Sequence, residues 1–274
     1  MDSTAPAITA PRRDPRQSPL FVRSLEKGLK VLSAYDASHR RLGLGEVARR
    51  TGLSKSAAQR FTHTLHALGY LRQDRESRAY GLSPQVLALG FAYLRSDELV
   101  TRATPHLLDA NKRCEETVNL TEPDGLQIVY VARVPSRHVV SVDVVLGTRL
   151  PMFCTAPGRA ILAYLPEDEA ADMIDRSKRV AWTPHTVTDR DALMRVLEDV
   201  RQRGYAIAEQ ETYLGDMSIA APVLDAAGRP VASVNVAVPT TRWNVADCRR
   251  TLVPLVMETA RVISAEIGAA PSHS

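Results

Sequence analysis

Apolar and polar side chains follow a helical period between Lys55 and Leu68. Ala58, Phe61, Leu65 and Leu68 are separated by steps of 3, 4 and 3, which predicts one buried stripe on an α-helix. Ser54 precedes the stripe and can cap the helix. The other face is polar and contains no acidic residue: Lys55, Ser56, Gln59, Arg60 and His63. A solvated helix face usually mixes both charges. Two interpretations therefore remain, a merely polar surface or a face that contacts DNA.

The flanking segments favour DNA contact. A short helix is expected at 45–50, followed by a turn at 51–54, and this arrangement predicts a helix-turn-helix. An upstream helix starting at Ser24, with Leu25, Leu29 and Leu32 as its apolar residues, would close a three-helix core. Strands at 70–73 and 78–82 would form a wing. We therefore predict a winged helix-turn-helix domain at 21–82 that binds double-stranded operator DNA through Arg23, Ser54, Lys55, Ser56, Gln59, Arg60, His63, Arg72, Arg75 and Arg78.

Charge is distributed unevenly along the 274 residues. Residues 1–95 contain 16 Lys and Arg against 7 Asp and Glu, whereas the remainder contains 19 against 24. A basic first third is typical of a chain that meets a polyanion with one of its parts. Residues 1–20 form a Pro-rich leader with Arg12, Arg13 and Arg16, which we expect to be disordered.

A helical linker and a second domain follow. Ser83-Pro84 predicts the start of a linker helix over 83–97. Its stripe of Val86, Leu87, Phe91 and Leu94 predicts either packing within the chain or a dimer contact. A helix at 99–116 follows, with a kink or restart at Pro105. Residues 98–270 then alternate β-branched runs (117–121, 126–134, 138–147, 205–209, 218–223 and 231–238) with helices at 156–165, 167–178, 189–203 and 245–267. This order predicts an α+β domain around a mostly antiparallel sheet.

Several classes of protein are disfavoured. No apolar run is long enough for a membrane span and no signal peptide is evident, so we expect a cytoplasmic protein. Cys114, Cys154 and Cys248 have no metal-ligand spacing, and neither a metal nor a cofactor is expected. His106, His138 and His185 form no catalytic arrangement, so an enzyme is not expected. An enzyme with an attached DNA-binding module and a DNA-binding architectural protein remain as rival functions.

The ordered segments resemble the IclR (isocitrate-lyase-regulator) family of transcriptional regulators. They are RSLEKGLKVLSAYD, LGEVARRTGLSKSAAQRFTHTLHALGY, YGLSPQVLALGFAYL, IVYVARVPSR, GTRLPMFCTAPGRAILA, RGYAIAEQE and SIAAPVLDAAGRPVASVNVA. Within the family, the chain is most similar to regulators of aromatic catabolism by the β-ketoadipate pathway. The resemblance implies a GAF-like effector-binding domain, a dimer or dimer of dimers, and DNA binding tuned by a small aromatic or related carboxylate.

The resemblance also implies an effector pocket between the loop 152–159 and the strands at 218–221 and 234–237. Its candidate residues are Arg133, Met152, Thr155, Ala156, Gly158, Met217, Ser218 and Asn235. The loop precedes a helix, so its amides could receive an anion, and Arg133 is the candidate cation for a carboxylate. The structural alternatives are backbone packing for Gly158, a satisfied polar group for Asn235 and a surface charge for Arg133. Ala156-Pro157 and Met217 depart from the Ser-Met and Arg usual in the subgroup, which predicts a more apolar pocket.

Overall fold

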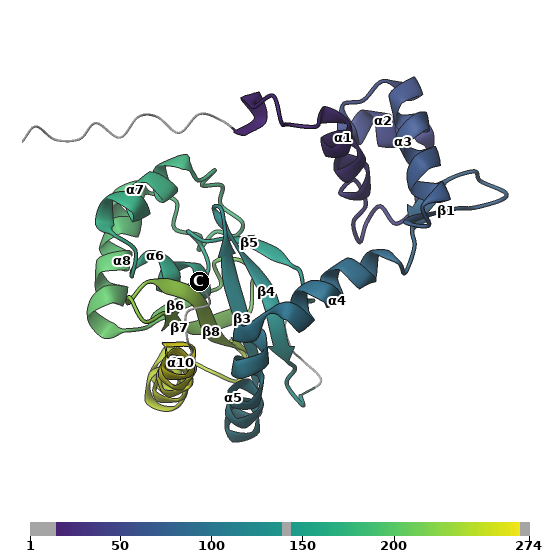
Figure 1. Cartoon of the computed structure of the whole chain (residues 1–274). Helices are drawn as coiled ribbons and strands as arrows, with labels where there is room; N and C mark the ends of the chain where they lie inside the picture. Colours follow the sequence, from purple (N-terminus) through teal and green to yellow (C-terminus); the bar gives the residue numbers. More distant parts are fainter. Residues whose placement is uncertain (1–14, 139–143, 269–274) are drawn as a thin grey trace, which may run out of the picture. The chain divides into compact units, whose positions relative to one another are not determined.

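The computed structural model describes residues 15–138 and 144–268, which form two compact units, Met1–Tyr93 and Leu94–Ser274 (Figure 1). Residues 1–14 of the predicted leader lie outside the described residues. The boundary between the units falls within the predicted linker helix. None of the described helices is both long and apolar enough to cross a membrane.

The first unit is a winged helix-turn-helix, as predicted. Its elements are η1 (Pro15–Gln17), α1 (Arg23–Leu32), α2 (Leu44–Thr51), α3 (Lys55–Ala67), β1 (Leu71–Gln73) and β2 (Tyr80–Leu82). The turn between α2 and α3 begins at Gly52, whose φ of 69° ends α2 in the left-handed conformation that glycine adopts without strain. Ser54 caps α3, because its Oγ accepts a hydrogen bond of 3.2 Å from the Ala57 backbone N–H. β1 and β2 pair as an antiparallel hairpin, which is the wing.

The core of this unit differs from the predicted stripes at three points. Leu68 is 58% exposed, whereas Thr62 is fully buried on α3. The Thr62 Oγ1 donates to the Ala58 carbonyl oxygen at 2.8 Å, so its polar atom is satisfied inside the helix and its methyl group can pack. Leu25 and Leu29 are exposed on α1, where Val31 supplies the buried contact. α1 also starts at Arg23 without a side-chain cap, rather than at a Ser24 cap.

Two helices follow the wing. α4 (Val86–Ser96) begins two residues after the predicted Ser83-Pro84 start, and none of its residues is buried within the described chain. α5 (Glu98–Cys114) is capped by Asp97, whose carboxylate accepts from the Val100 N–H at 3.2 Å. α5 continues through Pro105, so no new helix begins there.

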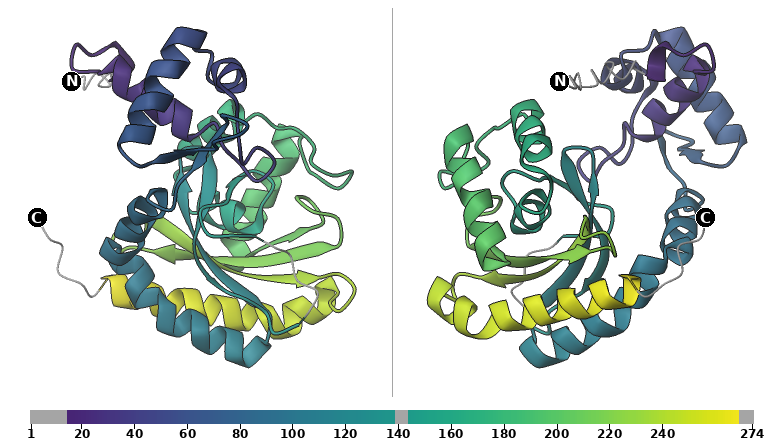
Figure 2. Two further views of the ribbon diagram at one scale, coloured as in Figure 1. Left: turned by 90° about the vertical axis from the view of Figure 1, so that its right-hand side faces the viewer. Right: turned by 60° about the vertical axis from the view of Figure 1, so that its left-hand side comes forward.

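The second unit is built on one six-stranded antiparallel sheet in the order β5-β4-β3-β8-β7-β6. The strands are β3 (Thr117–Asp124), β4 (Gln127–Val134), β5 (Arg149–Pro151), β6 (Ala206–Glu209), β7 (Asp216–Leu224) and β8 (Pro230–Pro239). One face of the sheet is covered by α5 and α10 (Val253–Gly268), and the other by α6 (Ala156–Leu162), α7 (Glu167–Arg176) and α8 (Arg190–Arg203) (Figure 2). The α+β prediction is confirmed.

Three local predictions need correction. The β3–β4 turn lies at Gly125-Leu126 rather than 122–125, because β3 remains paired through Asp124. The predicted strand at 138–147 includes residues 139–143, which lie outside the described residues, and β5 was not predicted. The final helix is interrupted: α9 (Val245–Asp247) leads into a π-helical turn, Cys248–Leu252, before α10. Pro254 follows this turn and has no backbone N–H to donate, which accounts for the irregular backbone hydrogen bonding of the π-helical turn before it.

Candidate functional site

The outer face of α3 and the wing enclose a concave surface. Lys55, Gln59, Arg60 and His63 from α3 and Arg78 beside β2 line it, together with the first residues of α2. All ten predicted DNA-contact residues are exposed. Within the described part of the chain, none of their cationic side chains forms a salt bridge. These guanidinium and ammonium groups are therefore available to an external anion.

The remaining predicted contacts have different positions. Ser56, Arg72 and Arg75 are exposed but do not line the concave surface, and Arg23 lies on α1. Ser54 is used as the cap of α3.

Asp74 organises the tip of the wing. Its carboxylate accepts from the Ser77 N–H at 2.9 Å and the Ser77 hydroxyl at 2.8 Å, and it forms a salt bridge of 3.0 Å with Arg41. The hydrogen bonds from Ser77 are the main reason that the pKa of Asp74 is lowered. The Asp74 carboxylate is thus paired within the chain, whereas Arg75, Glu76 and Arg78 remain exposed beside it.

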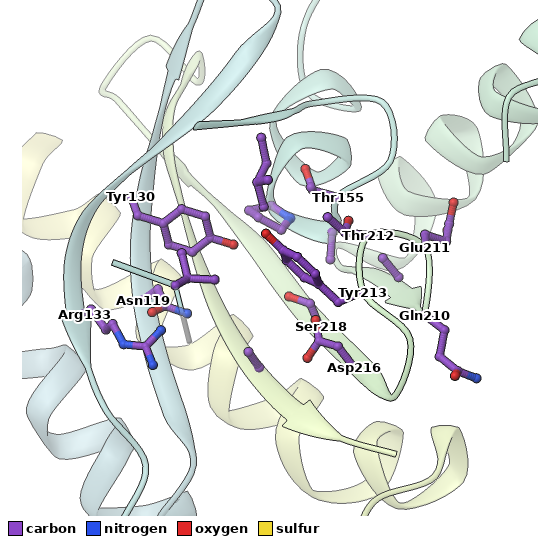
Figure 3. Close-up of a pocket in the computed structure, with 16 residues that line it drawn as sticks. Asn119, Tyr130, Arg133, Thr155, Gln210, Glu211, Thr212, Tyr213, Asp216 and Ser218 are labelled. Carbon is purple, nitrogen blue, oxygen red and sulfur yellow. The ribbon is translucent and has the colours of Figure 1, made fainter. Parts of the chain in front are cut away.

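The second unit contains a small cavity between the start of α6, the sheet and the loop 210–216 (Figure 3). Its volume is about 30 Å³. Four of the predicted effector residues line it: Arg133 on β4, Thr155 and Ala156 at the start of α6, and Ser218 on β7. The structure therefore brings together side chains that are separated by up to 85 positions in the sequence.

The other four predicted residues do not line this cavity. Met217 points to the opposite face of the sheet, where its sulfur lies 3.5 Å from the Cys248 sulfur, because successive residues of a strand alternate sides. Met152 is buried beneath α6. A Cβ on Gly158 would lie 2.3 Å from the Met152 Cα, so this glycine permits close backbone packing. Asn235 donates to the Ser218 Oγ at 3.0 Å and orients that hydroxyl from behind.

The amides at the start of α6 are mostly satisfied within the chain. The Thr155 Oγ1 accepts from the Gly158 N–H at 3.2 Å, and the Thr155 carbonyl oxygen accepts from the Arg159 N–H at 3.0 Å. Pro157 has no N–H. The predicted set of amides for an anion is therefore reduced, and Arg133 is left as the cationic side chain that lines the cavity.

Polar residues that the sequence did not indicate complete the lining: Asn119, Tyr130, Gln210, Glu211, Thr212, Tyr213 and Asp216. Burial raises the pKa of Asp216 to about 7. Burial is also the main cause that raises the pKa of Tyr130, with a further contribution from the charge of Asp216. The period of β7 could have revealed Asp216, since a strand that points Ser218 into the cavity also points the residue two positions earlier there.

A buried ion pair fixes the loop that closes the cavity. Arg159 is only 2% exposed, and its guanidinium forms two hydrogen bonds with the Glu211 carboxylate, one of them 2.6 Å long. The Arg159 Nε donates to the Phe153 carbonyl oxygen at 2.8 Å, and the Val187 N–H donates to Glu211 at 3.0 Å. The Thr212 hydroxyl donates to the Cys154 carbonyl oxygen at 3.2 Å. The loop is therefore attached at two points, through Glu211 to Arg159 of α6 and through Thr212 to Cys154, which precedes α6.

Family models match both units. The IclR helix-turn-helix domain matches residues 24–75, and the bacterial transcriptional regulator IclR C-terminal domain matches residues 91–265. The chain belongs to the IclR family. Among curated relatives, the Pca regulon regulatory protein of Pseudomonas putida is 34% identical over 89% of this chain and 83% of its own length. The p-hydroxybenzoate hydroxylase transcriptional activator of Acinetobacter baylyi is 32% identical over 88% of this chain and 90% of its own length.

Solved structures agree with this assignment. A putative transcriptional regulator from Rhodococcus sp. RHA1 is 37% identical, has a TM-score of 0.79 and matches 90% of this chain and 98% of its own. An IclR-family protein with this two-unit architecture is a ligand-responsive transcriptional regulator and not an enzyme. The glycerol operon regulatory protein of Streptomyces coelicolor, which is also 34% identical, is named for a different pathway, so family membership alone does not identify the effector.

Proposed function

We propose that this IclR regulator binds operator DNA as a homodimer through α3 and the wing, and senses a small aromatic carboxylate in the cavity beneath the loop 210–216. The observation that carries the DNA-binding part is the exposed, unpaired basic face of α3 beside the wing. The observation that carries the effector part is a cavity in which Arg133 and the ring of Tyr130 line one space. The name of the Acinetobacter relative supports an aromatic pathway.

The proposed roles of the individual side chains on DNA follow from the hydrogen-bond donors that each side chain carries. Gln59 can pair with adenine, and Arg60 or Lys55 with guanine, in the major groove. Arg72, Arg75 and Arg78 contact phosphates, which adds affinity without sequence preference. Two copies are needed because a helix-turn-helix reads half-sites about one DNA turn apart.

The surface of α4 supports the dimer. Leu87 is 62% and Phe91 61% exposed, and Leu89 is also exposed. An apolar helix face of this kind costs free energy in water and is typical of a protein–protein contact. We propose that a second copy covers it, giving a dimer or a dimer of dimers.

Binding of the proposed effector requires a wall of the cavity to move. A cavity known to accommodate benzene measures about 150 Å³, whereas this one measures about 30 Å³. The loop 210–216 must therefore shift for an aromatic acid to enter, with Arg133 as the partner of its carboxylate. We propose that the effector favours one arrangement of this unit and that α4 and α5 transmit the change, by no more than the difference in effector affinity between the two states.

The first experiment is a gel shift with DNA upstream of the regulator's own gene and with scrambled DNA, at two salt concentrations. Preferential and salt-sensitive binding of the native fragment is expected, because both base and phosphate contacts are proposed. Equal binding of both fragments at both salt concentrations would contradict sequence-specific regulation.

A second experiment tests the effector class. The thermal midpoint of the protein is measured with benzoate, hydroxybenzoates and non-aromatic acids at equal concentration. Stabilisation by aromatic acids is expected, because a ligand that binds only the folded state raises its stability. Stabilisation by non-aromatic acids alone would overturn the aromatic assignment and leave the regulator assignment intact.

A further inference from the structure

The cavity contains hydrogen-bond acceptors that the protein does not use. Asp216 Oδ1 and Asn119 Oδ1 are buried and have no hydrogen-bond partner in the described chain, and both residues line the cavity. Asn235 Oδ1, behind Ser218, has none either. Buried polar atoms are nearly always paired, and an unpaired acceptor costs free energy. A ligand with a hydrogen-bond donor would remove this cost.

Asp216 shares the cavity with other polar side chains. β7 carries it, Tyr130 and Arg133 face the cavity from β4, and Tyr213 faces it from the loop (Figure 3). Tyr130, Tyr213 and Asp216 all line the cavity, and the charge of Asp216 contributes to the raised pKa of both tyrosines. Glu211 is occupied by Arg159. Burial is the larger influence on the pKa of Asp216 and raises it, whereas a hydrogen bond from the Met217 N–H lowers it.

We propose that Asp216 determines effector specificity by accepting a hydrogen bond from a hydroxyl group on the effector. The effector class is then a hydroxylated aromatic acid, with its carboxylate directed to Arg133 and its ring hydroxyl to Asp216. This inference rests on the function proposed above and adds the chemical group that the cavity selects. An acid that lacks the hydroxyl leaves the buried Asp216 Oδ1 unpaired, and is rejected for that reason.

The direction of the pH dependence follows from the donor. The effector hydroxyl donates, so the ionised form of Asp216 is the one that binds. With a pKa of about 7, a fall from pH 8 to pH 6 protonates most of Asp216 and lowers the affinity for a hydroxylated acid about tenfold. The effector keeps its own charge in this range, because carboxylic acids titrate near pH 4 and phenols near pH 10. An acid without the hydroxyl shows no such loss.

The test is calorimetric titration of the full chain with 3-hydroxybenzoate, 4-hydroxybenzoate, benzoate and 4-methylbenzoate at pH 8 and pH 6. At pH 8 we expect at least one hydroxybenzoate to bind about 10- to 100-fold more tightly than benzoate or methylbenzoate. Asp216→Leu should reduce this ratio to about threefold or less. Asp216→Asn retains an acceptor oxygen but not the charge, so it should bind hydroxybenzoate with an affinity that no longer depends on pH.

Asp168→Asn is the matched control, since Asp168 is an exposed carboxylate on α7 outside the cavity. It should bind like the wild type, and the thermal midpoint of each variant verifies folding. Binding of methylbenzoate within threefold of every hydroxybenzoate would overturn the role of Asp216 while leaving an aromatic-acid sensor in place. Unchanged selectivity in Asp216→Leu would have the same meaning. Binding of none of the four acids would overturn the proposed sensing of aromatic acids, and this inference with it.

Discussion

The two units hold their charged side chains in opposite ways. On the concave surface of the first unit, Lys55, Arg60 and Arg78 are exposed and have no ion-pair partner in the described chain. In the second unit, Arg159 and Glu211 are buried together, and Asp216 Oδ1 is buried without a partner. A solvated charge costs folding almost nothing, whereas a buried charge must be paired or lose stability. DNA binding should therefore be separable from stability in the first unit, whereas the proposed effector binding and stability should be coupled in the second.

The largest effect is expected from Glu211→Gln. The change leaves the buried Arg159 charge without its partner, and should lower the free energy of unfolding by about 3–5 kcal/mol. Denaturant unfolding followed by circular dichroism measures it. Glu169→Gln is the matched control, because Glu169 pairs with Arg229 at 3.2 Å on the surface and should cost about 1 kcal/mol or less. Equal losses in both variants would contradict the contrast between buried and exposed charges.

Asp216→Asn should change stability with a defined pH dependence. The folded pKa of about 7 exceeds 3.8, the ordinary pKa of an aspartate, so the wild type loses stability as pH rises from about 4 to 7 and the full cost is present above pH 7. The variant has no such cost. Its stability relative to the wild type should therefore increase by about 2–3 kcal/mol from pH 5 to pH 8. Unfolding curves at both pH values check this, and a constant difference would show that Asp216 titrates normally.

Arg60→Ala should separate DNA affinity from stability. Loss of one contact to a base edge should weaken binding of the native operator by about 1–3 kcal/mol, with an unchanged thermal midpoint. Fluorescence anisotropy with operator and scrambled DNA measures both affinities. Arg195→Ala, which removes an exposed cation on α8, is the control. A similar loss on both DNAs would indicate that Arg60 contacts phosphate rather than a base.

The smallest effect is expected from Arg75→Ala on the wing. A lost phosphate contact should weaken native and scrambled DNA equally and reduce the slope of log affinity against log salt by about one. Titrations at four salt concentrations measure the slope. Loss of affinity for native DNA alone would instead assign Arg75 to base recognition.

The sequence predicted those features that depend on neighbours along the chain. Ser54 at the start of α3 and the end of the helix predicted at 189–203, where Gly204 has a φ of 81°, depend on local signals, and the structure confirms both. Exposed basic residues on α3 could also be predicted, because helical period and charge are properties of one segment.

The cavity could not be predicted to the same extent, because it combines six segments that are distant in the sequence. The face of β7 that points into the cavity depends on the pairing of β7 with β6 and β8. A shift of this pairing by one position would turn Met217 into the cavity in place of Asp216. The burial of Thr62 in place of Leu68 has the same origin, since the neighbouring elements determine which part of a helix is covered. Pairing of Arg159 with Glu211 spans 52 positions and leaves no local pattern.

The small volume of the cavity has a kinetic consequence. At about 30 Å³ it is smaller than the roughly 150 Å³ that accommodates benzene, so the proposed aromatic effector can enter only after the walls separate. The observed association rate should then rise with effector concentration only until it equals the opening rate, and remain constant above it. The Arg159–Glu211 pair, which fixes the loop, would set this ceiling and so limit how quickly the regulator responds to a sudden rise in effector.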